Sequence, residues 1–313
     1  MGIVGTLSEI IKEQWEWRKQ ILSLGLFDLR KISRGAVLGT FWFFAKPAVY
    51  IFCFWFALEV GLRSGDQSAD GAPYILWLMG GLVPWFYMQD MLGAGVDVFH
   101  RYSYLVTKIK FPLSGIPIIY SISNLIVQCG LIVVLLLVFF FYGQVPSLHL
   151  IQIPIALVLM FVFFAMFSLM TSCLSAISKD FKNLMQTLST PLFWLSGIIF
   201  NVFDIGIPWV EGVLMFNPVT FIATMYRYAV YDHMWIWQKP EAIIGFSVVF
   251  IVTLAAMAVI LYYIEIPVVA FYKLDLSTLP AILAGFAMGP LPGVAVVVIK
   301  NLVHMLGTST ACV

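Results

Sequence analysis

The chain has 313 residues, of which 62% are hydrophobic, 16% aromatic and only 11% charged, and its net charge is +1. Soluble domains average roughly 45–50% apolar and about 25% charged residues, so a soluble globular protein is excluded, and the many aromatic residues exclude a disordered chain. The balanced charge offers no basic surface for nucleic acid, which leaves an all-α integral membrane protein with several spans.

Residues 1–35 form a charged segment that precedes the apolar part of the chain. Apolar residues recur at helical spacing from Leu7 to Leu26, with charged residues between them. This pattern predicts an amphipathic helix, Leu7–Lys31, that lies along the inner face of the membrane. Such a helix is either a membrane anchor or a docking surface for a cytosolic partner.

Six apolar segments follow, and we expect each to cross the membrane as a helix within a domain that covers residues 36–264. The longest stretch without a charged residue, Phe111–Ser178, has 68 residues. As one helix it would be about 100 Å long against a hydrocarbon core of roughly 30 Å, so it must fold back at the turn-forming cluster Gly143–Ser147. The predicted spans are 36–60, 74–98, 115–142, 149–178, 184–203 and 241–264.

Two of these spans carry charged residues. Lys46 lies in the first span, just before Pro47, and Asp90 lies in the second. At ~1.5 Å per residue, Lys46 is about 15 Å and Asp90 about 12 Å from the expected inner boundary. The similar depth predicts an intramembrane charge pair, because a lone charge in a membrane is costly. The alternative is that Lys46 extends along its stem to the interface.

The segment between the second and third spans, Arg101–Phe111, is short and basic. A short helix here would protrude into the cytosol, where tyrosine rings can fill a pocket of a partner and cations can meet acidic side chains. The competing interpretation is a plain basic loop on the inner side. The candidate coupling residues are Arg101, Tyr102, Tyr104, Lys108 and Lys110.

The segment Asp204–Pro240 is too long and too apolar for a plain loop. It predicts two short re-entrant helices between spans five and six, held by contacts with the bundle. Aromatic rings stack well on sugar rings, so this segment is a candidate exit for a glycan, and the alternative is an ordinary aromatic belt. The candidate exit residues are Trp209, Tyr226, Tyr228 and Tyr231.

The placement of lysine and arginine predicts the orientation. With the N-terminus inside, the inner segments carry 11 of these residues and the outer loops carry 3. This bias predicts a multi-pass protein of the cytoplasmic membrane with a cytoplasmic N-terminus.

No catalytic motif is present in the sequence. It lacks a GxxxxGK[ST] phosphate loop, a GxSxG serine elbow and an HExxH motif, and its four histidines are far apart. We therefore expect no catalytic residue, no metal site and no cofactor bound by this chain.

Several motifs resemble the permease subunits of ABC exporters for polysaccharides and teichoic acids. These motifs are Asp28–Lys31 with Arg34–Gly39, Leu78–Trp85, Tyr104–Pro112, and Asn217–Pro218 with Tyr226–Arg227. The resemblance covers about residues 9–250. It implies a homodimeric transport subunit, not an enzyme, that binds a separate ATPase subunit and passes a lipid-linked glycan or teichoic acid. ATP is then used only by the partner, and the Arg101–Phe111 segment docks in it.

Residues 265–313 form an extra apolar tail that departs from this family. The stretches Lys273–Pro280, Gly285–Pro290 and Ile299–His304 resemble the start of the riboflavin-binding membrane subunit of energy-coupling-factor vitamin importers, over about 255–313. We interpret the tail as a fused or chimeric fragment of a vitamin transporter. The alternative is an exporter with an unusual membrane tail.

Two other functions compete with export. Vitamin (riboflavin) uptake rests only on the tail. A membrane glycosyltransferase would need clustered acidic or metal-binding residues at one membrane face, and Asp90 with Asp97 is too little for such a site.

Overall fold

The computed structural model describes residues 3–35, 37–62, 74–108, 111–112, 114–144, 146–263, 266–269, 272–274, 280, 284–285 and 290–309. Its α-helices are α1 (Ile3–Ser33), α2 (Trp42–Trp55), α3 (Tyr74–Gly93), α4 (Val98–Arg101), α5 (Ser103–Lys108), α6 (Gly115–Phe141), α7 (Gln152–Ile177), α8 (Lys179–Leu195), α9 (Pro208–Met215), α10 (Pro218–Val230), α11 (Pro240–Tyr263) and α13 (Pro290–Ser309). Shorter helical turns are η1 (Gly39–Phe41), η2 (Phe56–Leu62), η3 (Ala94–Asp97), η4 (Leu148–Ile151), η5 (Val202–Asp204) and η6 (Ile236–Gln238). The strands are β1 (Ile266–Val269) and β2 (Tyr272–Leu274).

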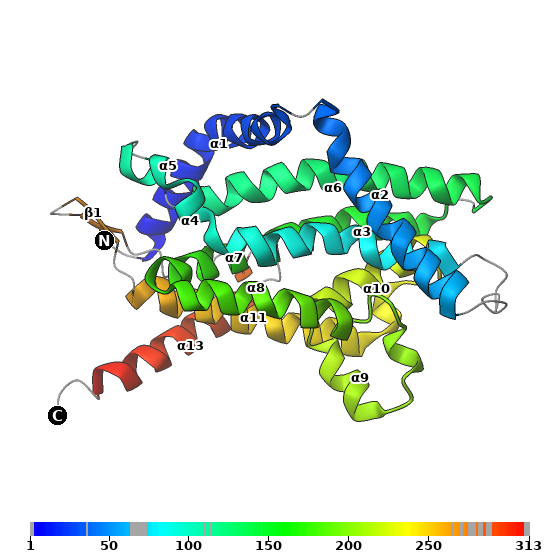
Figure 1. Ribbon diagram of the computed structural model, residues 1–313. Helices are drawn as coiled ribbons and strands as arrows, with labels where there is room; N and C mark the ends of the chain where they lie inside the picture. The colour runs from blue at the N-terminus through cyan, green and yellow to red at the C-terminus, as the bar shows by residue number, and fades with distance from the viewer. Residues whose placement is uncertain are drawn as a thin grey trace.

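The long helices form one bundle with α3 in its middle, where it contacts α2, α6, α7, α8 and α10 (Figure 1). Leu76, Leu82 and Met88 of α3 are fully buried, as expected for a helix that is apolar on every face. We call the end of the bundle that carries α4 and α5 the α5 end. The opposite end, which carries α9, is the α9 end (Figure 1).

Within the residues that the structure describes, four of the predicted spans correspond to helices that are long and apolar enough to cross a membrane. They are Gly39–Gly61, Gly115–Phe141, Leu148–Ile177 and Pro240–Met257. The chain is thus a multi-pass membrane protein. The first of these helices lies on the outside of the bundle, and only 6% of its apolar window is buried.

The long uncharged stretch folds back where its turn-forming residues predict. The helix α6 ends at Phe141 and α7 begins at Gln152, and the two pack against each other. Between them Gly143 has φ +79°, a left-handed conformation that glycine adopts without a steric penalty. The predicted break at 143–147 is confirmed.

The fifth apolar segment differs from its predicted bounds of 184–203. The helix α8 begins earlier, at Lys179, where the Ser178 hydroxyl accepts a hydrogen bond from Phe181 N, as an N-cap does. It ends at Leu195, before Gly197 with φ +65°. Its 17 residues span roughly 25 Å, slightly less than a hydrocarbon core.

Two short helices, α9 and α10, lie in the segment for which two were predicted. They differ strongly in burial. Trp209 and Val213 of α9 are exposed, whereas every residue of α10 from Val219 to Val230 is buried, against α3 and α7. The helix α10 is therefore part of the core, to which α9 contributes its last residue, Met215.

The predicted amphipathic helix is present as α1, which packs along α6. Its buried stripe comprises Ile21, Gly25 and Asp28, at the spacing of one helix face. Gly25 lets the two backbones approach, and its carbonyl accepts a 2.9 Å hydrogen bond from the Ser123 hydroxyl.

The tail begins with a feature that the all-α prediction did not include. The strands β1 and β2 pair antiparallel, with Ile266 opposite Leu274. β-branched residues such as Val269 favour this extended conformation. Farther on, α13 packs against α11, and its Val296 is fully buried.

Candidate functional site

A buried carboxylate joins α1 to the segment between α3 and α6. The Asp28 side chain is 5% exposed and accepts hydrogen bonds from Tyr102 Oη at 2.8 Å and from Arg101 Nη2 at 3.4 Å. The Arg101 guanidinium also lies 4.9 Å from the ring centre of Tyr120. Burial and the neighbouring Asp28 carboxylate raise the pKa of the Tyr102 hydroxyl, which therefore stays protonated and donates.

This arrangement divides the predicted coupling residues into two groups. Tyr102 is buried, and both Tyr102 and Arg101 bind Asp28 of the same chain. The prediction that the Tyr102 ring enters a partner is therefore wrong, and this side chain supports the segment from inside. Tyr104 is 40% exposed and remains available to a partner. The side chain of Lys108 and all of Lys110 lie outside the described residues.

A second charged cluster at the α5 end ties η3 to α7 and α8. The Asp97 carboxylate pairs with Lys182 Nζ at 2.5 Å and with His100 Nδ1 at 2.7 Å. Ser175 Oγ donates to the same carboxylate at 3.2 Å. These contacts hold together the segment between the second and third spans and the segment between the fourth and fifth spans. Both segments are predicted to lie at the inner face of the membrane.

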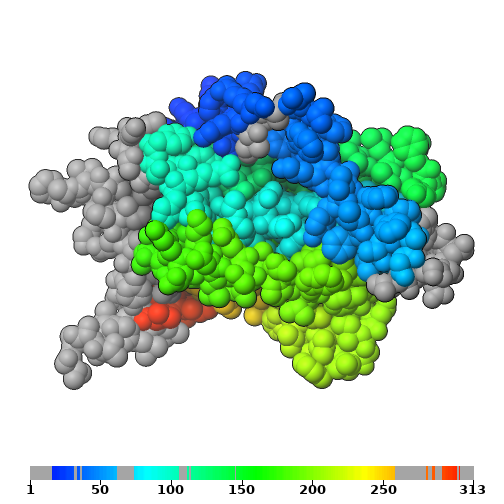
Figure 2. Space-filling view, in the orientation of Figure 1, coloured from blue at the N-terminus to red at the C-terminus, as the bar shows by residue number. Residues whose placement is uncertain are grey.

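An open cavity of about 990 Å³ lies among α2, α3, α6 and α8. Figure 2 shows the residues of α3 recessed between α2 and α8. Aromatic and amide side chains such as Trp42 and Gln89 line this cavity, together with Lys46, Asp90 and Arg101. The wall is mostly apolar, with a small number of amides and charges, as in many ligand-binding cavities.

The structure brings Lys46 and Asp90 to the same cavity without joining them. Both line its wall, but among the described ion pairs, which have N···O distances up to 4.0 Å, neither residue takes part. The predicted direct pair is thus replaced by two separate charges. Each faces a space large enough for water or a ligand.

At the α9 end a buried arginine joins α10 to α3 and to the turn after α8. The guanidinium of Arg227 donates to Gly197 O at 2.6 Å, to Ile198 O, and to Trp77 O at 3.3 Å. It also lies 3.4 Å from the ring centre of Trp77. Backbone carbonyls thus solvate this cation in the protein interior, where an unsolvated charge would be costly.

Two motifs that sequence reasoning matched only by resemblance have a physical role in this network. A Cβ atom at Gly81 would overlap the Arg227 guanidinium, and one at Gly80 would lie 3.0 Å from Arg227 Cγ. Asn217 caps α10 through Val219 N at 3.0 Å and donates to Ser196 Oγ at 2.7 Å. Sequence analysis did not predict a role for the Arg227 side chain. The sequence signal that could have indicated one is the presence of a charged residue within an apolar segment.

The predicted glycan-exit aromatics do not form one surface. Tyr226 and Tyr228 are buried in the core, at 0% and 6% exposure. The prediction that they contact a glycan at the exit is therefore wrong, because their rings pack inside the protein. Trp209 is 73% exposed but lies apart on α9. Of the four predicted residues, Tyr231 is the one that lines a cavity at the α9 end. The other residues of that cavity were not predicted as exit residues.

The fold and the large cavity define a class: a multi-pass membrane protein in which a large cavity with charged residues in its wall lies beside a helix that is long enough to span the membrane. The family described as ABC-2 type transporter matches residues 19–231. The chain therefore belongs to this family, and it is a membrane transport subunit whose family implies an ABC ATPase partner.

Two relatives extend this comparison. An O-antigen export system permease protein from Myxococcus xanthus is 22% identical over 237 residues, which cover 74% of this chain and 86% of the relative. One from Klebsiella pneumoniae is 25% identical over 212 residues, which cover 64% and 75%. The resemblance to polysaccharide exporter permeases is confirmed.

The tail has a separate match. The family described as ECF transporter, substrate-specific component, matches residues 246–313. This region begins inside α11, where Phe246 stacks on Phe221 of α10 at 4.3 Å between ring centres. The second match thus starts within a helix that packs in the core of the first.

Proposed function

We propose that this chain is the permease subunit of an ABC exporter that carries a lipid-linked polysaccharide out across the cytoplasmic membrane. The observation that carries the proposal is the likeness of most of the chain to O-antigen export permeases, over 237 residues in one case. Hydrolysis of ATP by a separate subunit drives the step, so this chain needs no nucleotide site. A teichoic acid, whose chain contains phosphate groups, is the alternative polymer.

The charge distribution supports the orientation. With a cytoplasmic N-terminus, the α5 end faces the cytosol and the α9 end faces outward. The ion pairs of Asp97 with Lys182 and of Asp28 with Arg101 then join segments that all lie at the inner face. This agrees with the excess of lysine and arginine in those segments.

A second copy of the chain is the proposed partner for α2. Its apolar side chains Val49 and Phe52 are exposed, as is Phe56 at the start of η2. The helix α8 exposes Leu188 and Trp194. Both helices border the 990 Å³ cavity. A copy that covered these faces would close the cavity into a path between two subunits, shielded from lipid.

The segment α4–α5 is the proposed contact with the ATPase. It is short, it lies at the α5 end (Figure 1), and Asp28 holds it from behind through Tyr102 and Arg101. A rigid support transmits a displacement, whereas a loose loop would absorb it. The exposed ring of Tyr104 is the side chain that we expect to enter the ATPase.

The test is co-expression with the ABC ATPase subunit from the same organism that the family implies as a partner. The two subunits should purify together in detergent as a complex with two copies of each. A lipid-linked polysaccharide should stimulate ATP hydrolysis in proteoliposomes, whereas an ATPase variant without its phosphate-loop lysine should not respond. Purification of the permease alone, under conditions where the ATPase is folded and abundant, would contradict the proposal.

Vitamin uptake is a second candidate because residues 246–313 match a substrate-specific component of another transporter type. Riboflavin binding to the full chain, measured by quenching of riboflavin fluorescence, tests it. Binding that is lost on truncation at Tyr272 would favour uptake. Truncation without any loss of assembly with the ATPase would favour an exporter that carries a foreign tail.

A further inference from the structure

A second cavity, of about 390 Å³, lies at the α9 end, away from the large one. Its walls come from the start of α3, from residues 200–205 and from the residue that follows α10. Its volume falls in the range of roughly 300–1,000 Å³ that is typical of small-molecule sites. The lining residues are Tyr74, Trp77, Phe200, Asn201, Asp204, Ile205 and Tyr231.

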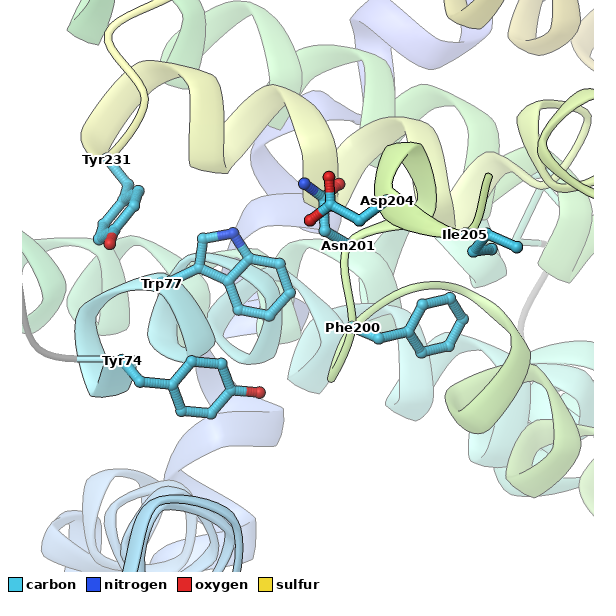
Figure 3. A pocket seen from close by; sticks show the side chains of 7 residues that line it. All are labelled: Tyr74, Trp77, Phe200, Asn201, Asp204, Ile205 and Tyr231. Carbon is cyan, nitrogen blue, oxygen red and sulfur yellow. The ribbon is translucent and has the colours of Figure 1, made fainter. Parts of the chain in front are cut away.

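The lining separates into rings and polar groups. Figure 3 shows the indole of Trp77 in the middle of the cavity wall, with Tyr74 and Tyr231 near it. The amide of Asn201 and the carboxylate of Asp204 project together beside that ring (Figure 3). Tyr74 and Trp77 are themselves stacked, with ring centres 5.6 Å apart.

The two walls are fixed to each other. Arg227 packs on Trp77 and donates to the carbonyls of Gly197 and Ile198. Tyr74 Oη donates to Ile199 O at 2.8 Å. The start of α3 and the turn before η5 are thus cross-linked, so the cavity is preformed and a ligand would not bear the cost of ordering it.

The polar groups retain capacity for a ligand. Asn201 Oδ1 caps η5 by accepting from Phe203 N at 3.2 Å, which leaves the amide Nδ2 as a donor. Asp204 is exposed, and within the part of the chain that the structure describes its carboxylate joins no ion pair. The cavity therefore offers a donor and a strong acceptor in a wall that also carries aromatic rings.

We propose that this cavity binds one or two sugar units of the exported polymer at the outer face. A sugar ring has an apolar C–H face that packs on an aromatic ring, and a rim of hydroxyls that hydrogen-bond to a carboxylate and an amide. A purely apolar ligand would leave Asp204 desolvated. A phosphate group would be repelled by Asp204, so the lipid carrier's anionic headgroup does not fit.

The proposal rests on the proposed function, since the polymer supplies the sugar. It places a saccharide-binding site where the polymer leaves the transporter. This site is separate from the proposed path beside α2. A saccharide bound here would be kept outside while the subunits reset, which would oppose backward slippage.

The probes are four disaccharides: maltose, cellobiose, lactose and diacetylchitobiose. Saturation-transfer difference NMR on the detergent-purified permease–ATPase complex should detect binding of at least one of them, with the strongest transfer to ring C–H protons. Asp204→Ala should weaken that binding about tenfold, because one hydrogen bond to a charged group is lost. Trp77→Phe should also weaken it while keeping an aromatic ring beneath Arg227.

Matched controls lie at the same end of the molecule. Glu241 is an exposed carboxylate at the start of α11, and Trp237 is an exposed indole in η6; neither lines the cavity. Glu241→Ala and Trp237→Ala should leave binding unchanged. Equal losses in the control and cavity variants would overturn the site, as would the absence of binding by all four disaccharides.

Stimulated ATP hydrolysis and polymer export, measured on the same preparations, separate the two proposals. Export without disaccharide binding would sink the sugar site and leave the exporter function standing. The opposite result is a complex that exports no polymer but binds a disaccharide, with binding abolished by Asp204→Ala. That result would support the sugar site and contradict the exporter function.

Discussion

The two ends of the bundle each contain a buried charge, but they neutralise it in different ways. At the α5 end the Asp28 carboxylate meets two side chains, Arg101 and Tyr102. At the α9 end the Arg227 guanidinium meets three backbone carbonyls and the Trp77 ring, and no described acidic side chain pairs with it.

The two networks suit the two ends to different tasks. The Asp28 carboxylate fixes the α4–α5 segment to α1, so a displacement of α5 by a partner would be passed on to α1 and to α6, on which α1 packs. Carbonyls belong to the backbone, so the Arg227 network holds the start of α3 and the turn after α8 in one arrangement. We expect the α5 end to transmit motion and the α9 end to keep its shape.

The sharpest way to break this comparison is Arg227→Met. It leaves three carbonyls without a donor and removes the cation from Trp77, so the free energy of unfolding should fall by about 3–5 kcal/mol, as when one member of a buried polar pair is removed. Thermal unfolding in detergent measures this. Lys239→Met, which removes a half-buried cation over Phe203 at 4.6 Å, should cost below about 1 kcal/mol.

Gly81→Ala tests the same network from α3. The added methyl would overlap the guanidinium of Arg227, and such overpacking costs about 1–3 kcal/mol. The control is Gly212→Ala in α9, where no atom lies within 4 Å of the new Cβ. Because alanine favours a helix, Gly212→Ala should be neutral or slightly stabilising, and equal losses in both variants would refute the explanation.

Asp28→Asn tests the α5 end. The amide keeps the shape but loses the charge that Arg101 and Tyr102 bind, so stability should fall by about 1.5–3 kcal/mol. The stimulation of ATP hydrolysis by substrate should fall with it, since α5 loses its support. Asp180→Asn, an exposed change in the first turn of α8, should cost no more than about 1 kcal/mol and leave stimulation intact.

A double-mutant cycle on Lys46 and Asp90 tests whether the two charges in the large cavity interact directly, as the buried charges at the two ends do with their partners. Neither residue takes part in an ion pair with another described residue, so their coupling energy in thermal unfolding should stay below about 1 kcal/mol. A coupling of several kcal/mol would mean that the two side chains meet in the membrane-embedded protein.

Tyr104→Ala should have the smallest effect on stability, within about 0.5 kcal/mol, because the ring is exposed. It should nevertheless weaken ATPase binding or uncouple hydrolysis from export. Tyr142→Ala removes an equally accessible ring at the other end of α6 and should leave both unchanged. Normal export by Tyr104→Ala would reject α5 as the coupling element.

Local patterns sufficed for much of the fold. The uncharged length of 111–178 required a turn, and α6 and α7 meet at it. Charged and apolar residues alternated at helical spacing, and α1 follows. The fifth span was harder, because the first turns of α8 carry polar residues that composition alone does not distinguish from loop residues.

The candidate site was predicted less completely. Tyr226 and Tyr228 are aromatic and lie in a segment expected at the outer face, yet both are buried, because α10 packs on α3 and α7. Residue type says that a ring can stack on a sugar, not which side of its helix faces the core. The sugar cavity gathers residues from three distant segments for the same reason.

What the sequence determined by itself was everything that depends on composition and short-range periodicity: a membrane protein, its main apolar helices, its fold-back and its family. Only the tertiary structure decided the partners of the charged residues. Asp28 finds Tyr102 74 residues away, and Arg227 finds Trp77 150 residues away. Such pairings follow from how helices pack against one another, and helix packing depends on the shapes of whole surfaces rather than on any local spacing.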